Sequence, residues 1–156
     1  MRVGAGSLAA AALLLLAACR GGLEPQAIPL DRVNCARCGM LVSDPTSAAE
    51  VVFTNSDALF YDDLGCLASA RIVADHPFEL WVRVDGGTAW KRASEAFYAK
   101  PVDARTPMGY GILAFSSPEK ARARDREARA RDWQEIERET PSRVEGREAS
   151  AGKDGA

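Results

Sequence analysis

The chain is most tightly constrained by residues 34–43, where two cysteines are followed at once by a glycine and a methionine. In the order Cys35-Ala-Arg-Cys38-Gly39-Met40, a turn directs both thiols to one side, and Gly39 allows the positive φ that folds the backbone back toward them. Thiolate and thioether sulfur are soft donors that favour Cu(I), or Zn(II) for thiolates, over hard cations. The segment therefore predicts a soft-metal site, with Cu(I) as the first interpretation.

The first nineteen residues predict a lipoprotein signal that is not part of the fold. Arg2 gives a positive start, and residues 8–18 form an apolar run too short to span a bilayer. The run ends in Leu-Ala-Ala-Cys, the order of a bacterial lipobox, which predicts cleavage after residue 18 and lipid on Cys19. The alternatives are an ordinary secretory signal or an uncleaved anchor. Because Arg20 follows rather than an aspartate, we expect attachment to the outer membrane, facing the periplasm.

Lipidation of Cys19 would leave three thiols, Cys35, Cys38 and Cys66, so at least one has no partner for a disulfide within the chain. In an oxidising compartment an unpaired thiol needs a task, and metal ligation is one. Cys66 lies at the start of a predicted helix, where the helix dipole favours the thiolate and two nearby aspartates oppose it. The alternative for Cys66 is a buried structural cysteine.

The length of 156 residues suits one domain, which we expect at 35–135. A tether at 19–34, with glycines and prolines, would precede it, and a disordered polar tail at 136–156 would follow. Residue patterning predicts an α+β fold of two small β-β-α-β modules. The expected strands are 50–54, 58–61, 78–84, 88–91 and 111–115, and the expected helices are 63–73, 94–98 and 118–131.

Charge and motifs exclude several classes of function. A net charge of −2 argues against electrostatic binding of nucleic acid, and there is no nucleophile–base pairing or phosphate-binding glycine loop. The expected helix 118–131 carries six basic residues, which suggests either a docking surface for an anionic partner or a solvated helix with internal ion pairs. We favour ion pairs, because acidic residues are interspersed among the basic ones.

Two further interpretations of the Cys35–Cys38 pair stay open. A structural zinc site needs four ligands, which would have to include Cys66 and His76, the only histidine. A redox-active dithiol would use the same two cysteines, but that arrangement requires a helix directly after the motif, and no helical pattern follows Gly39. Copper would instead gain thioether donors, for which Met40 and Met108 are the candidates.

The ordered motifs resemble the NosL family of copper-binding lipoproteins associated with nitrous-oxide reductase. The resemblance covers about residues 10–120, and it rests on the lipobox, Cys35-Ala-Arg-Cys38-Gly39-Met40, Phe60-Tyr61-Asp62-Asp63-Leu64-Gly65-Cys66, Pro107-Met108-Gly109 and Ala114-Phe115. One departure is that the histidine often found shortly after this methionine is absent, since Met108 is followed by Gly-Tyr-Gly-Ile. The copper site would then use sulfur alone, or the protein would serve another client or metal.

The resemblance implies a Cu(I) chaperone rather than an enzyme. It implies delivery of copper in the periplasm to nitrous-oxide reductase or to its maturation ABC-type complex, and a fold like that of the organomercurial lyases. Met108 becomes a ligand candidate on this analogy, beside Cys35, Cys38, Met40 and Cys66. Transfer would proceed by ligand exchange from an under-coordinated site.

Overall fold

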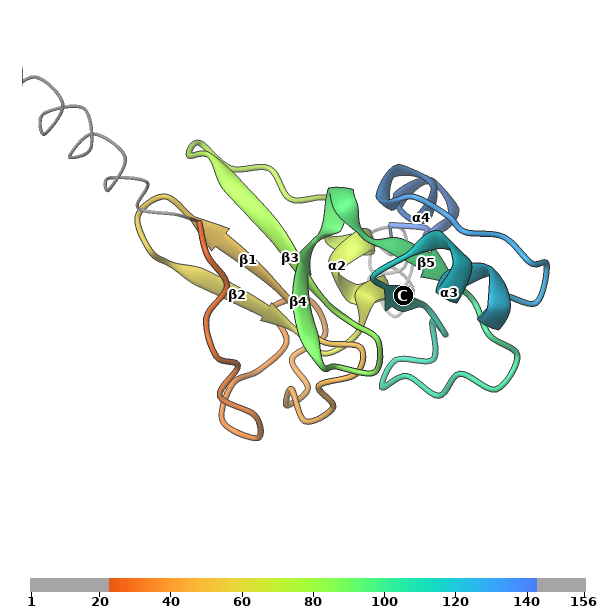
Figure 1. The fold of residues 1–156 in the computed structure, drawn as a ribbon. Helices are drawn as coiled ribbons and strands as arrows, with labels where there is room; N and C mark the ends of the chain where they lie inside the picture. The colour runs from red at the N-terminus through yellow and green to blue at the C-terminus, as the bar shows by residue number, and fades with distance from the viewer. Residues whose placement is uncertain (1–22, 143–156) are drawn as a thin grey trace, which may run out of the picture.

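The computed structural model describes residues 23–142, so the predicted signal, the lipidation of Cys19 and the tail beyond residue 142 lie outside the described residues. The described part is a mixed α+β fold, as predicted, with one six-stranded sheet and three α-helices (Figure 1). Its elements are β1 (Ala49–Phe53), β2 (Ala58–Tyr61), α2 (Leu64–Ala70), β3 (Phe78–Val84), β4 (Ala89–Arg92), η1 (Ala93–Glu95), β5 (Phe97–Ala99), β6 (Leu113–Phe115), α3 (Pro118–Arg124) and α4 (Trp133–Glu139).

The first half follows the predicted order of hairpin, helix and strand. β1 pairs with both β2 and β3 in antiparallel register, so that Val51 stands opposite Leu59 on one side and Leu80 on the other. β3 covers the residues that the alternating pattern predicted, because every second side chain faces the core. α2 is shorter than expected, since Arg71 takes a left-handed conformation with φ 50° and ends the helix.

The second half is built differently from the expected module. The predicted helix 94–98 is instead the single turn η1 followed by strand β5. β5 pairs with β6, and β6 joins β3 in parallel at Val84 and Ala114, which gives the sheet order β2-β1-β3-β6-β5 with β4 also beside β3. A strand forms here because alternate residues serve opposite faces: Tyr98 packs in the main core, and Ala99 in a smaller second core.

The predicted helix 118–131 is also corrected, because α3 ends at Arg124. Asp125 takes an extended conformation, and its carboxylate accepts the backbone N–H groups of Glu127 and Arg129, which turns the chain away from the helix. α4 then begins with a capping box between Asp132 and Glu135. Residues 136–139 of the predicted tail are therefore helical, and Ile136 is fully buried.

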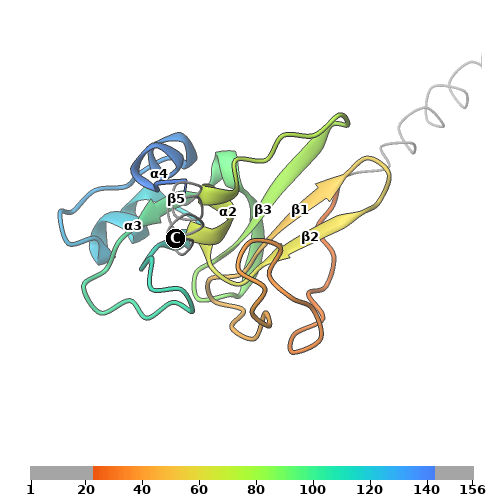
Figure 2. The same cartoon turned by 180° about the vertical axis from the view of Figure 1, so that it is seen from behind.

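Helices cover both faces of the sheet, at different places. α2 lies behind the sheet in Figure 1 and in front of it in Figure 2. It shares the main core with α4, where the rings of Tyr98 and Trp133 lie 5.5 Å apart. α3 packs through Ala121 on the second core at the β5–β6 end. The start of α2 is thus held between the hairpin and the second half of the chain.

The described part of the predicted tether, residues 23–34, contacts the domain. The indole N–H of Trp81 donates to the Leu23 carbonyl at 2.6 Å, and the Gln26 N–H donates to the buried Glu50 carboxylate at 2.8 Å. Asp31 N–H donates to the Val42 carbonyl at 2.9 Å. Within residues 23–142, no helix combines the length and the apolar character needed to cross a bilayer.

Candidate metal centre

The loop 35–41 brings its two cysteines together through its own backbone. The N–H of Cys35 donates to the Met40 carbonyl at 2.7 Å, and the N–H of Gly39 donates to the Cys35 carbonyl at 2.9 Å. Gly39 closes the turn with φ 79°, as the sequence predicted. The Ala36 N–H donates to the Phe60 carbonyl at 2.8 Å, which fixes the loop on the end of the hairpin.

The two aspartates before α2 have separate roles. Asp63 is the N-cap, and its Oδ1 accepts the Gly65 N–H at 2.8 Å. Asp62 precedes the cap and turns its carboxylate toward the loop, while its carbonyl accepts the Ser47 hydroxyl at 3.0 Å. Cys66 lies in the first turn of the helix and is buried. The end of β2 and the start of α2 therefore each present one donor to the same place.

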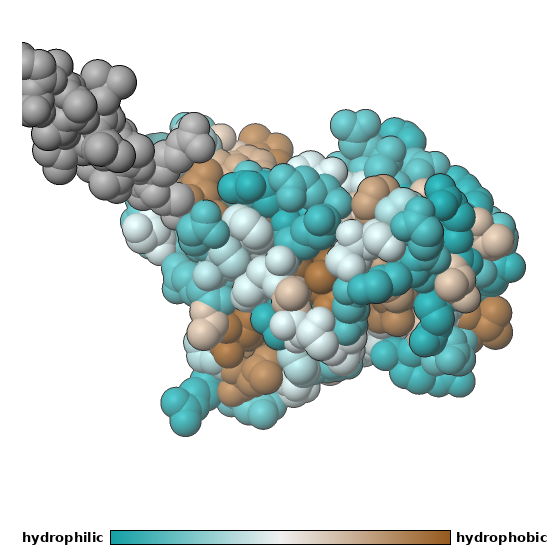
Figure 3. Space-filling view, in the orientation of Figure 1, coloured by the Kyte–Doolittle hydropathy of each residue, from teal (hydrophilic) through white to brown (hydrophobic). Residues whose placement is uncertain are grey.

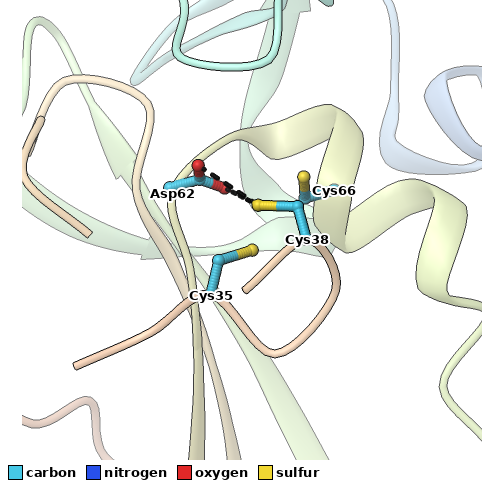
Figure 4. A group of neighbouring side chains, drawn as sticks. All are labelled: Cys35, Cys38, Asp62 and Cys66. Carbon is cyan, nitrogen blue, oxygen red and sulfur yellow. Dashed lines mark hydrogen bonds between the residues drawn. The ribbon is translucent and has the colours of Figure 1, made fainter. Parts of the chain in front are cut away.

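Three thiols and one carboxylate meet in this region. The ligand atoms of Cys35, Cys38, Asp62 and Cys66 all lie within 4.8 Å of one another. Figure 4 shows the side chains pointing toward a common space, with the Cys38 thiol donating to both Asp62 oxygens at 3.5 Å. Cys35 and Cys66 are buried, whereas Cys38 is partly exposed. We call these four residues the thiol cluster; it offers four donors with access from the Cys38 side.

The three thiols of the thiol cluster differ in pKa. The Cys66 thiol donates to Cys35, which lowers the pKa of Cys35 to about 6. The same hydrogen bond, together with burial, raises the pKa of Cys66 far above its usual range. Burial raises the pKa of Cys38 to about 11. Cys35 is therefore the first thiolate, and a metal bound by all three sulfur atoms displaces the protons of the other two.

The predicted methionines are placed differently from the cysteines. Met40 follows the cysteine loop with its side chain 49% exposed. Met108 is partly buried against the main core, and its N–H donates to Asp63 Oδ2 at 3.0 Å, so its loop is joined to the start of α2. Tyr110, in the same loop, lies over Gly65, where a Cβ would come within 1.9 Å of the ring. These contacts bring the Met108 loop to the first turn of α2.

His76, which the zinc interpretation required as a fourth ligand, is not in the thiol cluster. It is exposed in the loop between α2 and β3. The redox interpretation required a helix after Gly39, and residues 39–48 contain none.

Asp62 takes the fourth position, whereas the sequence analysis considered the two aspartates only for their effect on the Cys66 thiolate. The signal in the sequence is that two consecutive aspartates, Asp62 and Asp63, precede Cys66. One aspartate is enough to cap the helix, so the other is available as a ligand.

These observations define an α+β protein with a cysteine-rich candidate metal centre between a loop and a helix start. No known family model matches the sequence, and no curated protein matches it. Among solved structures, the chain is similar to the crystal structure of the copper chaperone NosL from Shewanella denitrificans. The TM-score is 0.55 and the identity 21%, over 65% of this chain and 85% of that chain. The chain therefore has the NosL fold.

Proposed function

We propose that this chain is a lipid-anchored Cu(I)-binding protein of the NosL family that carries copper to a client enzyme. The observation that carries the proposal is the thiol cluster: three sulfur atoms and one carboxylate oxygen within 4.8 Å, in a chain with the fold of a copper chaperone. Soft thiolates favour Cu(I), which is stable with two or three sulfur ligands. The partly exposed Cys38 is the ligand that an incoming donor would displace first.

The same resemblance supports the cellular setting. We propose that Cys19 carries the lipid, that the protein faces the periplasm from the outer membrane, and that the client is nitrous-oxide reductase or its maturation ABC-type complex. Delivery is ligand exchange and involves no chemical turnover, so the protein is a carrier and not an enzyme. The lipobox can be tested by mass spectrometry of the mature protein, where a diacylated Cys19 is expected and an unmodified N-terminus would contradict it.

The metal is tested by anaerobic titration of the reduced chain from residue 19, with Cys19→Ser to prevent acylation. Cu(I) should bind tightly with one equivalent, and Cys35→Ser, Cys38→Ser and Cys66→Ser should each weaken binding. Met108→Leu asks whether the thioether takes part, and the matched control is His76→Ala, which lies outside the thiol cluster. Cu(I) affinity that is unchanged by all three cysteine substitutions would overturn the proposal.

Zinc is the second candidate, because Asp62 completes a set of four ligands without His76. Three thiolates and a carboxylate suit tetrahedral Zn(II), and a structural site of this kind would stabilise the fold. In that case zinc would remain bound through purification, and chelation would unfold the protein. A copper carrier should instead keep its fold when the metal is removed, since its main core is built mostly from apolar side chains that need no metal to pack.

The third candidate function is thiol–disulfide redox chemistry. The lowered pKa of Cys35, to about 6, also suits an attacking thiolate in a dithiol protein. A disulfide between Cys35 and Cys38 that forms and breaks at a mild potential, together with weak Cu(I) binding, would favour that function. Thiol labelling of the protein as isolated under anaerobic conditions separates the cases, because a copper carrier should show three free thiols.

A further inference from the structure

An open groove of about 440 Å³ runs beside the cysteine loop on the α2 side of the sheet. The loop contributes Ala36 and Arg37, and the hairpin contributes Leu59 and Tyr61. The residues that follow α2 form the other wall, with Arg71, Ile72 and Val73. The groove therefore lies between three segments that also build the thiol cluster: the loop, the end of β2 and α2.

Of the six large apolar residues that are exposed among the described residues, two line the groove and two more lie in the cysteine loop. Val73 is 94% and Leu59 is 39% exposed, and both line the groove. Met40 and Leu41, about half exposed, follow Cys38 in the same loop. Figure 3 shows the face opposite to α2, where mostly hydrophilic residues cover α3 and α4 and an apolar patch lies at the lower left, over the loops before β1. Clustered exposed apolar residues of this kind mark interaction sites.

The charge of the groove has one sign. Arg37 and Arg71 are its only charged lining residues. The Arg71 guanidinium donates to the backbone carbonyls of Ala68, Glu137 and Thr140, which hold it in place without neutralising its charge. Among the described residues, no hydrogen bond or ion pair of the Arg37 side chain is found. An apolar groove with two positive edges is complementary to an apolar segment that carries carboxylates.

The groove is also close to Cys38, the partly exposed thiol of the thiol cluster. Arg37 is adjacent to Cys38 in the sequence, and the hydrogen bond from Ala36 to Phe60 holds this part of the loop against β2. Two residues of extended chain span at most about 7 Å, so a partner on Ala36 and Arg37 is within reach of the Cys38 thiol. A protein seated in the groove could offer a ligand to the metal while it is bound.

We propose that the groove is the docking surface for the metal-receiving protein, which presents an apolar segment flanked by acidic side chains. The proposal rests on the proposed function for its purpose, but docking does not need bound metal. Arg37 guides the acidic segment, Leu59 and Val73 hold its apolar side chains, and the partner's metal ligand meets Cys38.

The test uses two peptides that differ only in charge. One has a methionine between leucines with two glutamates as flanking residues, and the other has lysines in place of the glutamates. Each is titrated by NMR into the isotope-labelled chain from residue 19 with Cys19→Ser, both metal-free and loaded with Cu(I). The acidic peptide should bind, with shifts at residues 36–37, 59 and 70–73. The basic peptide should bind at least about tenfold more weakly.

Reversing the charge of Arg37 is the decisive substitution. Arg37→Glu should weaken binding of the acidic peptide about tenfold and strengthen binding of the basic one, since reversing one side reverses the preference. Arg122→Glu, the same change on the exposed surface of α3, is the matched control and should alter neither. Docking of both variants is scored on the metal-free chain and Cu(I) affinity is measured separately, so loss of docking is distinguished from loss of the metal site.

Two results would overturn the proposal. One is equal binding of the two peptides, or shifts that lie outside the groove. The other is binding that begins only after residues 143–156 are deleted, because the groove would then be covered by the chain's own C-terminal segment. If the acidic peptide binds as expected and Cu(I) does not bind at all, the docking surface stands and the proposed function fails.

Discussion

Within residues 23–142, two polar clusters with buried members differ in the charges that they bring together. The ion-pair network near α4 has the buried pair of Asp125 and Arg131 at its centre, and three positive and four negative side chains are in contact in it: Lys100, Asp125, Glu127, Arg129, Arg131, Glu135 and Glu139. The thiol cluster comprises three thiols and a carboxylate, and each of these groups is neutral when protonated and negative when ionised. The network satisfies its own charges, whereas the thiol cluster, once its thiols ionise, requires a cation from outside.

This difference teaches how to tell structure from function in a small domain. Buried charges are costly unless they are paired, so a network in which each buried charge contacts a partner of opposite sign is explained by the fold itself. A cluster of one sign is not explained by the fold, and it points to a ligand of the opposite sign. The cluster that holds α4 in place is therefore separate from the cluster that could hold a metal ion.

Removing the buried carboxylate of the ion-pair network is the strongest test of this difference between the two clusters. Asp125→Ala should lower the free energy of unfolding by about 3–5 kcal/mol, because it leaves Arg131 buried without its closest partner. Denaturant unfolding measures the change, and Arg122→Ala on the surface of α3 should leave the midpoint unchanged. Cu(I) affinity should be retained in the folded variant. A large loss of Cu(I) binding under native conditions would show that the two clusters are not independent.

The pH dependence of the network has a defined sign. Burial opposes ionisation of Asp125, but hydrogen bonds from three backbone N–H groups and from Arg131 hold its pKa at about 2, below the usual 3.8. The stabilisation it provides is present above pH 4 and should be lost as the pH falls from about 4 to 2. Asp125→Asn should flatten this part of the stability curve, as measured by thermal unfolding in that range.

A substitution in the thiol cluster should have the opposite effect, a loss of metal binding with little loss of stability. Cys66→Ser should weaken Cu(I) binding by at least about 100-fold, more than the loss of an outer-shell partner costs a metal site. The free energy of unfolding of the metal-free variant should stay within about 1 kcal/mol of the parent's, since serine is similar in size to cysteine and keeps a hydrogen-bond donor. Competition with a Cu(I) chelator measures the affinity. Unchanged affinity would assign Cys66 to the core as a structural cysteine.

Glu50 provides an intermediate case, a buried carboxylate that belongs to neither cluster. Burial raises its pKa from 4.5 to about 7, and Gln26 N–H is its only partner among the described residues. A raised carboxyl pKa means that stability falls as the pH rises from about 4.5 to 7. Glu50→Gln should therefore stabilise the protein at pH 8 by about 2 kcal/mol and have almost no effect at pH 4. Equal effects at both pH values would contradict this assignment.

The smallest expected effect distinguishes the two metals. Asp62→Asn should change Cu(I) affinity by only about threefold, because carboxylate oxygen is a poor ligand for a soft ion. Zn(II) affinity should fall by about tenfold or more, since Asp62 would complete its tetrahedron. Parallel titrations of the parent and the variant give both values. A large loss of Cu(I) affinity would mean that the carboxylate, and not sulfur alone, holds the copper.

Sequence reasoning predicted best where one local pattern decides the structure. Strand β3 was predicted at residues 78–84 because its alternation reflects one buried face, and the turn at Gly39 because few residues take that conformation. It failed where distant contacts decide. The predicted helix 118–131 ends at Arg124 because the Asp125 carboxylate also accepts the backbone N–H of Lys100, 25 residues earlier in the chain, which no local pattern identifies.

The candidate site was predicted in part for the same reason. The three cysteines could be identified by residue type and spacing, and the structure brings them together. Asp62 and Asp63 look alike in the sequence, and only the backbone at the start of α2 determines which one caps the helix and which one faces the thiols. The capping box of α4, Asp132 to Glu135, was visible in the sequence and was not used.

The bond from the Trp81 indole to the Leu23 carbonyl determines how far the domain can travel. Four peptide units separate Cys19 from Leu23, and they span at most about 14 Å when fully extended. If Cys19 carries lipid, as proposed, the linker confines the protein to a thin layer beside the bilayer. A client in the periplasm must then come to this layer to receive copper, because the linker does not let the domain leave the membrane surface.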